Sequence, residues 1–248
     1  MLSRTGFQRG NFGGVTSGGC LFYVSVHDPS NLELTSRQIS QRWHLTARDA
    51  FNGLQLWSRN LLDYYPDLVK AGVTPPASEE DIRKSNMKKD DLPAADLGGS
   101  LVVASDRLFG NLFGVPVAFA PETGDILKAY SVSGGIKSKV VSAHGLLYVT
   151  TATHLIALKP ESGVIAWQQE MAVSGLGRPY NYTGLLQAGK NIVALGSMPG
   201  DKSRSLIAFE PGSGKVVWKT DLSKQRKEVQ ALLWCHDDVI VMKWRTHR

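Results

Sequence analysis

A repeated phrase is the feature that most limits how this chain can fold. Residues 206–222 read LIAFEPGSGKVVWKTDL, and residues 155–171 read LIALKPESGVIAWQQEM. Each copy has an apolar run, a turn with proline and glycine, a second apolar run and a tryptophan. Looser copies occur at 47–57 and at 118–130, where Lys128 takes the place of the tryptophan. Repeats with a period of tens of residues are typical of solenoids and propellers.

The spacing of the copies indicates consecutive units of similar length. Asp106 precedes Gly124 by 18 positions (124 − 106), and Gly145 precedes Gly163 by the same 18 (163 − 145). The two units therefore superimpose at a period of 39 (163 − 124). A further unit opens at 230–244, and the sequence stops before its turn phrase. We expect four units and an incomplete fifth.

Glycine and tryptophan recur at fixed places because each has a physical task there. The last residue of the turn needs a positive φ, which glycine adopts without a clash of Cβ. The tryptophan stands four positions later, and we expect each indole to bury ~200 Å² against the neighbouring unit. A ligand cage is the weaker interpretation, because packing between repeated units already predicts one tryptophan per unit. The glycines are Gly53, Gly124, Gly163 and Gly214, and the tryptophans are Trp57, Trp167 and Trp218.

Residues 63–98 interrupt the pattern of strands. Pro66 and a later pair of prolines are typical of loops, whereas Ser78 followed by acidic residues has the pattern of a helix start. We expect an inserted loop with one short polar helix near residues 79–89, and we favour a solvated insertion over a binding lid. Apart from this insertion, residues 1–248 are expected to form a single, partial propeller domain.

Composition favours a globular β protein and gives no sign of a nucleic-acid partner or a membrane span. The 248 residues are 42% hydrophobic and include 25 glycines and 11 prolines, which favours short strands and tight turns. The formal charge is +6, but the basic residues are scattered, and the basic stretch 219–227 lacks interleaved aromatic residues. No run of about 18 apolar residues is present, and the first residues lack the apolar core of a signal peptide.

The turn phrase carries a family resemblance. The pattern A-x-D-x-x-x-G-x-x-x-W is complete at Ala47, Asp49, Gly53 and Trp57. Two of the other copies match it with Lys159 and Glu210 in its acidic position. The pattern resembles the tryptophan-docking repeat of the quinoprotein (pyrroloquinoline quinone, PQQ) β-propeller superfamily, and the match covers about residues 20–244.

The resemblance implies an all-β propeller of four-stranded antiparallel blades, usually closed by about seven or eight blades. Because an open arc of blades would expose apolar faces, we expect a fragment, either a truncated reading frame or one piece of a larger propeller. It also implies a periplasmic or otherwise extracytoplasmic location.

The quinoprotein alcohol dehydrogenases of that superfamily hold PQQ between a tryptophan and a ring formed by adjacent cysteines, with a calcium ion and an aspartate base. Here the only cysteines, Cys20 and Cys235, lie far apart in the sequence, and the histidines show no paired spacing. Asp49, Asp106 and Asp237 fit turn or strand-edge positions better than catalytic ones. We therefore predict no catalytic residue and no metal ligand, and the sequence identifies no cofactor-binding residue.

Two functional hypotheses follow. The first is a non-catalytic binding or scaffolding module that needs no cofactor and holds a protein or polysaccharide partner on its loop face, with other propeller blades in the intact protein. The second is a fragment of a PQQ- and calcium-dependent alcohol or sugar dehydrogenase whose active-site blades lie outside this chain. Retention of the PQQ chromophore after gel filtration distinguishes them.

Overall fold

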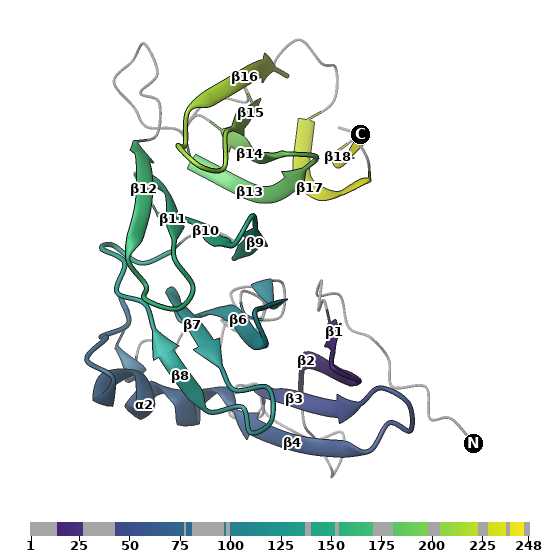
Figure 1. Ribbon diagram of the computed structural model, residues 1–248, viewed down its shortest axis with the longest axis vertical. Coiled ribbons are helices and arrows are strands. Elements are labelled where there is room, and N and C mark those ends of the chain that lie inside the picture. The colour runs from purple at the N-terminus through teal and green to yellow at the C-terminus, as the bar shows by residue number, and fades with distance from the viewer. Residues whose placement is uncertain are drawn as a thin grey trace. The chain divides into compact units, whose positions relative to one another are not determined.

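Four antiparallel four-stranded sheets and a two-stranded fifth make up the described part of the chain (Figure 1). The computed structural model describes residues 14–26, 43–76, 78–80, 97, 100–136, 140–151, 154–170, 181–197, 204–222, 228–236 and 239–245. The chain divides into two compact units, one of residues 1–113 and 118–128, the other of residues 114–117 and 129–248.

The first compact unit contains the first sheet and most of the second. The first sheet has the order β1-β2-β3-β4, and the second has the order β5-β6-β7-β8. In each sheet the strands follow one another in chain order, so every connection is a hairpin. The strands are β1 (Val15–Ser17), β2 (Cys20–Val26), β3 (Trp43–Asp49), β4 (Gln55–Asn60), β5 (Val102–Ala104), β6 (Arg107–Leu112), β7 (Val115–Phe119) and β8 (Ile126–Ala129).

The second compact unit contains the remaining sheets, which repeat the same arrangement. Their orders are β9-β10-β11-β12, β13-β14-β15-β16 and β17-β18. The strands are β9 (Val141–Ala143), β10 (Leu146–Thr150), β11 (His154–Leu158), β12 (Ile165–Glu170), β13 (Asn181–Ala188), β14 (Asn191–Ser197), β15 (Arg204–Phe209), β16 (Val216–Asp221), β17 (Glu228–His236) and β18 (Val239–Arg245).

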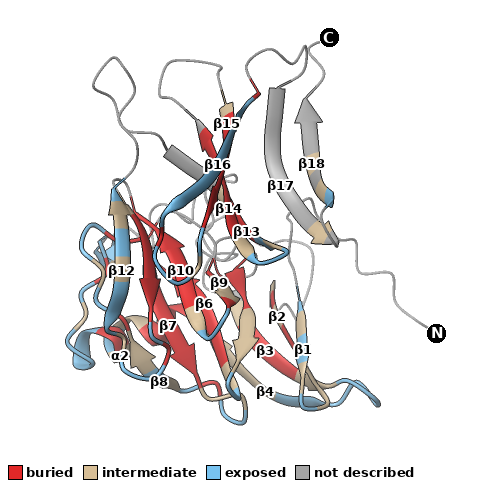
Figure 2. Ribbon diagram, turned by 45° about the horizontal axis from the view of Figure 1, so that its top comes forward, coloured by how far each residue is buried: buried red, intermediate tan, exposed pale blue. Residues whose placement is uncertain are grey.

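Apolar residues fill the space between consecutive sheets of the second unit. One face of the β13-β16 sheet packs against the β9-β12 sheet through a cluster that includes Tyr148, Ile192 and Phe209. Its other face packs against β17 and β18 through Val193, Ala208 and their neighbours. The middle strands are buried and the outermost strands β12 and β16 are mostly exposed, as Figure 2 shows. This is the layering of propeller blades, in which a sheet is covered on both faces by its neighbours.

The insertion begins with a helix that the sequence did not predict. A 3₁₀ turn, η2 (Leu61–Asp63), leads directly into α2 (Tyr64–Lys70). The interpretation of Pro66 as a loop signal is wrong, because proline in the first turn of a helix loses no intrahelical hydrogen bond. Glu79 and Glu80 are helical, and the remainder of the helix expected at 79–89 lies outside the described residues. Within the described residues, no helix is both long and apolar enough to cross a membrane.

The fold class expected from the sequence is confirmed: an all-β chain of antiparallel four-stranded blades, with a two-stranded fifth sheet and one short helix in the insertion. The further unit expected to open at 230–244 corresponds to β17 and β18. The assignment of 1–248 to one domain stays a prediction.

Candidate functional site

The turn phrase adopts one backbone geometry in all four complete sheets. In the first sheet Gly53 N–H donates to Asp49 O at 2.9 Å, and Asp49 N–H donates to Leu54 O at 2.8 Å. The same pair of bonds closes the other three turns, with 2.8–2.9 Å between donor and acceptor. Each turn ends on a glycine with positive φ, where a Cβ would strain the backbone. The φ angles are 75° at Gly53, 76° at Gly124, 71° at Gly163 and 72° at Gly214.

Two of the tryptophans bind the turn of the following sheet. Trp57 donates its indole N–H to Pro121 O at 2.7 Å, and its ring lies so close to Gly124 that a Cβ there would come within 2.6 Å of it. The same contact recurs in the second compact unit. Each bond joins a donor on one sheet to the proline that stands three positions before the turn glycine of the next.

In the second compact unit, Trp167 donates to Pro211 O at 2.6 Å, and a Cβ on Gly214 would come within 2.5 Å of its ring. Tyr148 adds a second donor to the same carbonyl at 3.3 Å, and its ring centroid lies 5.9 Å from that of Trp167. Burial raises the pKa of Tyr148 to about 12. The tyrosine therefore stays a neutral donor throughout the ordinary pH range.

In the second sheet Tyr130 makes the contact with the following turn that a tryptophan makes elsewhere. This contact was not predicted from the sequence. Lys128 occupies the tryptophan position there, but the buried Tyr130 donates its hydroxyl proton to Pro160 O. Pro160 stands three positions before Gly163, as Pro121 and Pro211 stand before their glycines. An aromatic residue two positions after the vacant tryptophan position was the available signal.

Trp218 differs from its two counterparts. Its side chain is 36% exposed, and no hydrogen bond of its indole is present within the described residues. Trp218 pairs with Ala208 across β15 and β16, as Trp57 pairs with Ala47 and Trp167 with Ala157, so it points to the same face of its sheet. The expected burial against a neighbouring unit does not hold here, because β17 and β18 include no docking turn among the described residues.

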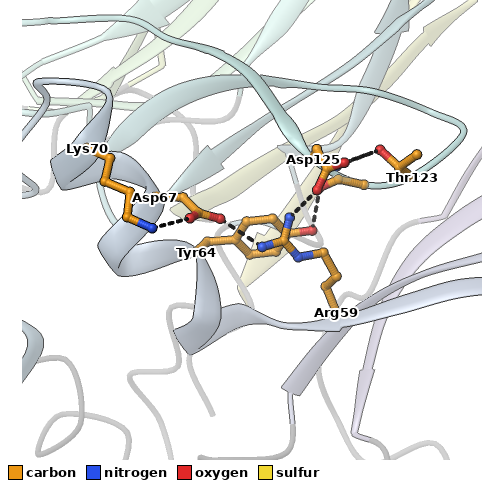
Figure 3. A network of polar contacts seen from close by, with 7 residues as sticks. Arg59, Tyr64, Asp67, Lys70, Thr123 and Asp125 are labelled. Carbon is orange, nitrogen blue, oxygen red and sulfur yellow. Dashed lines mark hydrogen bonds and ion pairs between the residues drawn. The ribbon is translucent and has the colours of Figure 1, made fainter.

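A second polar cluster joins α2 to the turn between β7 and β8 (Figure 3). Arg59 binds Asp67 and Asp125, each with 2.7 Å between nitrogen and oxygen, and its guanidinium carbon lies 4.3 Å from the ring centre of Tyr64. Tyr64 in turn donates to Gly124 O at 2.8 Å. Three side chains, from α2 and from the turn between β7 and β8, are thus held around the Arg59 cation.

The electrostatics of the cluster keep both central groups in their ordinary charge states. Burial lowers the pKa of Arg59, but the hydrogen bond to Asp67 and the nearby negative charges more than offset this, so its pKa is raised. Burial also raises the pKa of Tyr64 well above its usual range. Arg59 therefore remains a cation and Tyr64 a neutral hydrogen-bond donor, which suits a structural clasp.

The described acidic residues are used by turns and ion pairs. Asp49 accepts hydrogen bonds from Phe51 N–H and Asn52 N–H at 2.8 and 3.0 Å, and Glu210 accepts one from Ser213. Asp106 lies in a two-residue hairpin turn with φ 56°. Among the described residues, no group of three or more His, Cys, Asp and Glu side chains could hold a metal ion.

The residues described do not fit PQQ in the way the dehydrogenases hold it. The cysteines lie singly: Cys20 is in β2, and Cys235, in β17, packs with apolar residues of the fourth and fifth sheets. Neither has a cysteine beside it in sequence. The ring of adjacent cysteines that the resemblance implies therefore has no counterpart in this chain.

The fourth strands of the complete sheets carry several exposed apolar side chains. Val216 and Val217 in β16 are 54% and 52% exposed, and Leu127 in β8 is 53% exposed. Leu56 in β4 and Ile165 in β12 are also exposed. Since each of these strands ends its sheet in the described part of the chain, each also has one edge of backbone groups without a ladder partner. Exposed apolar edge strands are suited to binding extended protein segments.

Comparison of sequences identifies one family model, described as outer membrane protein assembly factor BamB, which matches residues 41–233. The match includes all four turn phrases completely and reaches from the third strand of the first sheet into β17. No curated protein matches the chain in the same kind of comparison.

Comparison of structures identifies propeller proteins of low sequence identity. The mitotic checkpoint complex aligns with a TM-score of 0.52 at 10% identity, over 94% of this chain and 60% of the other. The WD40 domain of Pan2 from Neurospora crassa aligns with a TM-score of 0.50 at 6% identity, over 84% and 49%. BamB from Moraxella catarrhalis aligns with a TM-score of 0.44 at 13% identity, over 84% and 50%. The chain spans less than two thirds of each of these structures.

Proposed function

Because the chain belongs to the PQQ-like repeat family whose model is described as outer membrane protein assembly factor BamB, we propose that it is a non-catalytic binding or scaffolding module. Its ligand is a protein, bound along the outermost strands of the blades. From the same family description, we propose that the protein acts outside the cytoplasm, in the assembly of outer-membrane proteins. No cofactor takes part in this function.

The observation that carries the proposal is the repeated exposure of apolar side chains on β4, β8, β12 and β16. Each such side chain follows a turn glycine by two or three positions, as Leu56, Leu127, Ile165 and Val217 show. Apolar groups in water cost free energy, about 25 cal/mol per Å² of surface, which a protein partner removes by covering them. A polysaccharide would instead require clustered polar groups, whereas the exposed positions named here are apolar.

Site-specific photocrosslinking tests the proposal. A benzophenone amino acid placed at Leu127 or at Val217 should form a discrete adduct with one protein partner in intact source cells. The same amino acid at Glu122, an exposed residue of a turn, is the matched control and should form none. Adducts equal at all three positions, or at none of them, would contradict protein binding at the outer strands.

A cofactor assay tests the non-catalytic part of the proposal. Purified protein is mixed with PQQ and Ca²⁺, passed through a gel-filtration column and examined for quinone absorbance. We expect no retained chromophore and no alcohol-dependent dye reduction. Stoichiometric retention of PQQ together with dye reduction would support the dehydrogenase hypothesis and contradict the scaffold hypothesis.

A further inference from the structure

The turn between β3 and β4 contains the one Asn-Gly pair of the sequence, at Asn52 and Gly53. Both residues are exposed. In the turns at Gly124 and Gly214 an indole ring occupies the place where a glycine Cβ would stand, whereas nothing lies within 4 Å of that place at Gly53. The Asn-Gly pair is therefore open to solvent, and no side chain of the described residues covers its glycine.

An asparagine caps this turn, where the other three turns use a hydroxyl group. Leu54 N–H donates to Asn52 Oδ1 at 2.8 Å. In the other sheets a hydroxyl oxygen accepts the corresponding bond at 3.2–3.3 Å. Those hydroxyl groups belong to Thr123, Ser162 and Ser213. Since a hydroxyl satisfies the same N–H, the geometry of the turn does not require the amide group of Asn52.

The turn places this amide group next to a backbone nitrogen that can attack it. The peptide nitrogen of Gly53 closes a succinimide ring when it bonds to Cγ of Asn52. The N–H of Leu54 stabilises the negative charge that develops on Oδ1 during the attack, as the donors of an oxyanion hole do. Glycine favours ring closure, because it has no Cβ beside the nitrogen and adopts a wide range of backbone angles. The bond from Gly53 N–H to Asp49 O, at 2.9 Å, has to break first.

We propose that Asn52 is a site of spontaneous deamidation, a covalent modification whose only co-reactant is water. The Gly53 nitrogen loses its proton to a base in the solvent and bonds to Cγ of Asn52, and the amide nitrogen leaves as ammonia. Water then opens the succinimide at either carbonyl carbon and leaves aspartate or isoaspartate at position 52. Because the reaction needs only water and the chain itself, it is independent of the proposed function.

Either product changes the turn. Aspartate adds a second carboxylate near Asp49, whose Oδ1 already accepts the N–H groups of Phe51 and Asn52. Isoaspartate adds a methylene group to the backbone, so the pair of bonds that joins Asp49 to Gly53 and Leu54 loses its spacing. Hydrogen exchange should therefore rise at the ends of β3 and β4 that meet in this turn once the modification has occurred.

Asn60 is a matched control within the same chain. Its Oδ1 accepts a hydrogen bond from Leu62 N–H at 2.9 Å, two positions further on, as in the turn at Asn52. The residue that follows it is the buried Leu61. The two asparagines thus share the side-chain hydrogen bond and differ in the residue that supplies the attacking nitrogen.

Incubation of the full chain in mildly alkaline buffer tests the proposal. Peptide mass spectrometry should show that the amide of Asn52 becomes a carboxylate at least about tenfold faster than the amide of Asn60. Isoaspartate and aspartate should both form, because water opens the ring on either side. The rate should rise with pH, since the attacking nitrogen has to lose its proton.

The variant Asn52→Ser removes the amide and keeps an acceptor for Leu54 N–H, as Ser162 and Ser213 do in their turns. It should form no isoaspartate in this turn, and its circular dichroism spectrum should match that of the unaltered protein. A sample denatured in urea gives the rate of the same Asn-Gly pair without the turn.

Each of several outcomes overturns the inference. Equal rates at Asn52 and Asn60 would show that the glycine gives no advantage, and aspartate without isoaspartate would exclude the succinimide. Modification of the denatured sample alone would show that the bond to Asp49 O protects the nitrogen in the folded chain. Isoaspartate formed to the same extent in the Asn52→Ser chain would place the modification elsewhere.

Discussion

The turn glycine and the aromatic side chain that covers it depend on each other at the scale of single residues. Gly124 and Gly214 meet two demands, a positive φ and a ring placed where a Cβ would stand. The spacing of the repeat predicts which residues meet, because a strand period of two fixes the face that each tryptophan points to. It does not predict Tyr130, because its contact depends on where the neighbouring turn lies in space.

Substitutions at Gly53 and Gly214 separate the cost of a positive φ from the cost of a clash with the indole. Gly53→Ala introduces only the strain of a positive φ, which lowers the free energy of unfolding by about 1–2 kcal/mol. Gly214→Ala meets the same strain and also places Cβ within 2.5 Å of Trp167, adding about 1–3 kcal/mol. Urea denaturation of the two variants checks the order. Equal losses would show that the indole moves aside without cost.

The raised pKa of Tyr148 predicts that the protein loses stability at alkaline pH. Burial raises its pKa from 10.0 to about 12, so between these values the unfolded chain releases the proton and the folded chain keeps it. The free energy of unfolding should therefore fall as the pH rises from about 10 to 12. Tyr148→Phe should reduce this slope and leave the slope between about pH 7 and 9 unchanged. Thermal unfolding across this range tests it, and identical alkaline slopes would contradict it.

At the scale of elements, strands were predictable where the turn phrase marks both of their ends. The sequence interpretation placed the hairpins of all four complete sheets, since apolar alternation and turn chemistry agree there. It missed α2, because Pro66 read alone breaks a helix while Pro66 in a first turn does not. The contacts that hold α2 come from Arg59 in β4 and Asp125 beyond β7, and no local pattern reports them.

The Arg59 cluster should control how firmly α2 is held. Arg59→Met keeps much of the apolar stem but removes the ion pairs with Asp67 and Asp125, so we expect a loss of about 1–2 kcal/mol. Hydrogen exchange of the amides in Tyr64–Lys70 should rise in parallel. Lys70→Ala is the matched control, because Lys70 is 80% exposed and its ion pair with Asp67 is long, at 4.0 Å. An equal effect of both substitutions would exclude a clasp centred on Arg59.

At the scale of the whole molecule, the chain repeats one kind of sheet, and in the second compact unit the β13-β16 sheet is covered on both faces by the sheets before and after it. Stability in such an array is approximately a sum of terms for each sheet and for each interface between neighbours. The repeat was predictable from the sequence because its turns are chemically specified. The exposure of Trp218 was not, because it depends on which residues lie beside β16 in space.

Nearest-neighbour coupling predicts that damage to one docking contact stays local. Gly214→Ala disturbs the contact between Trp167 and the fourth sheet, so hydrogen exchange should rise in β11, β12, β15 and β16. Exchange in β2 and β3 should stay as in the unaltered protein, because their sheet belongs to the other compact unit. Gly53→Ala reverses the comparison, with faster exchange in the first sheet alone. Mass spectrometry of deuterated peptides resolves these segments, and a uniform rise across all sheets would show that the chain opens as a single cooperative body.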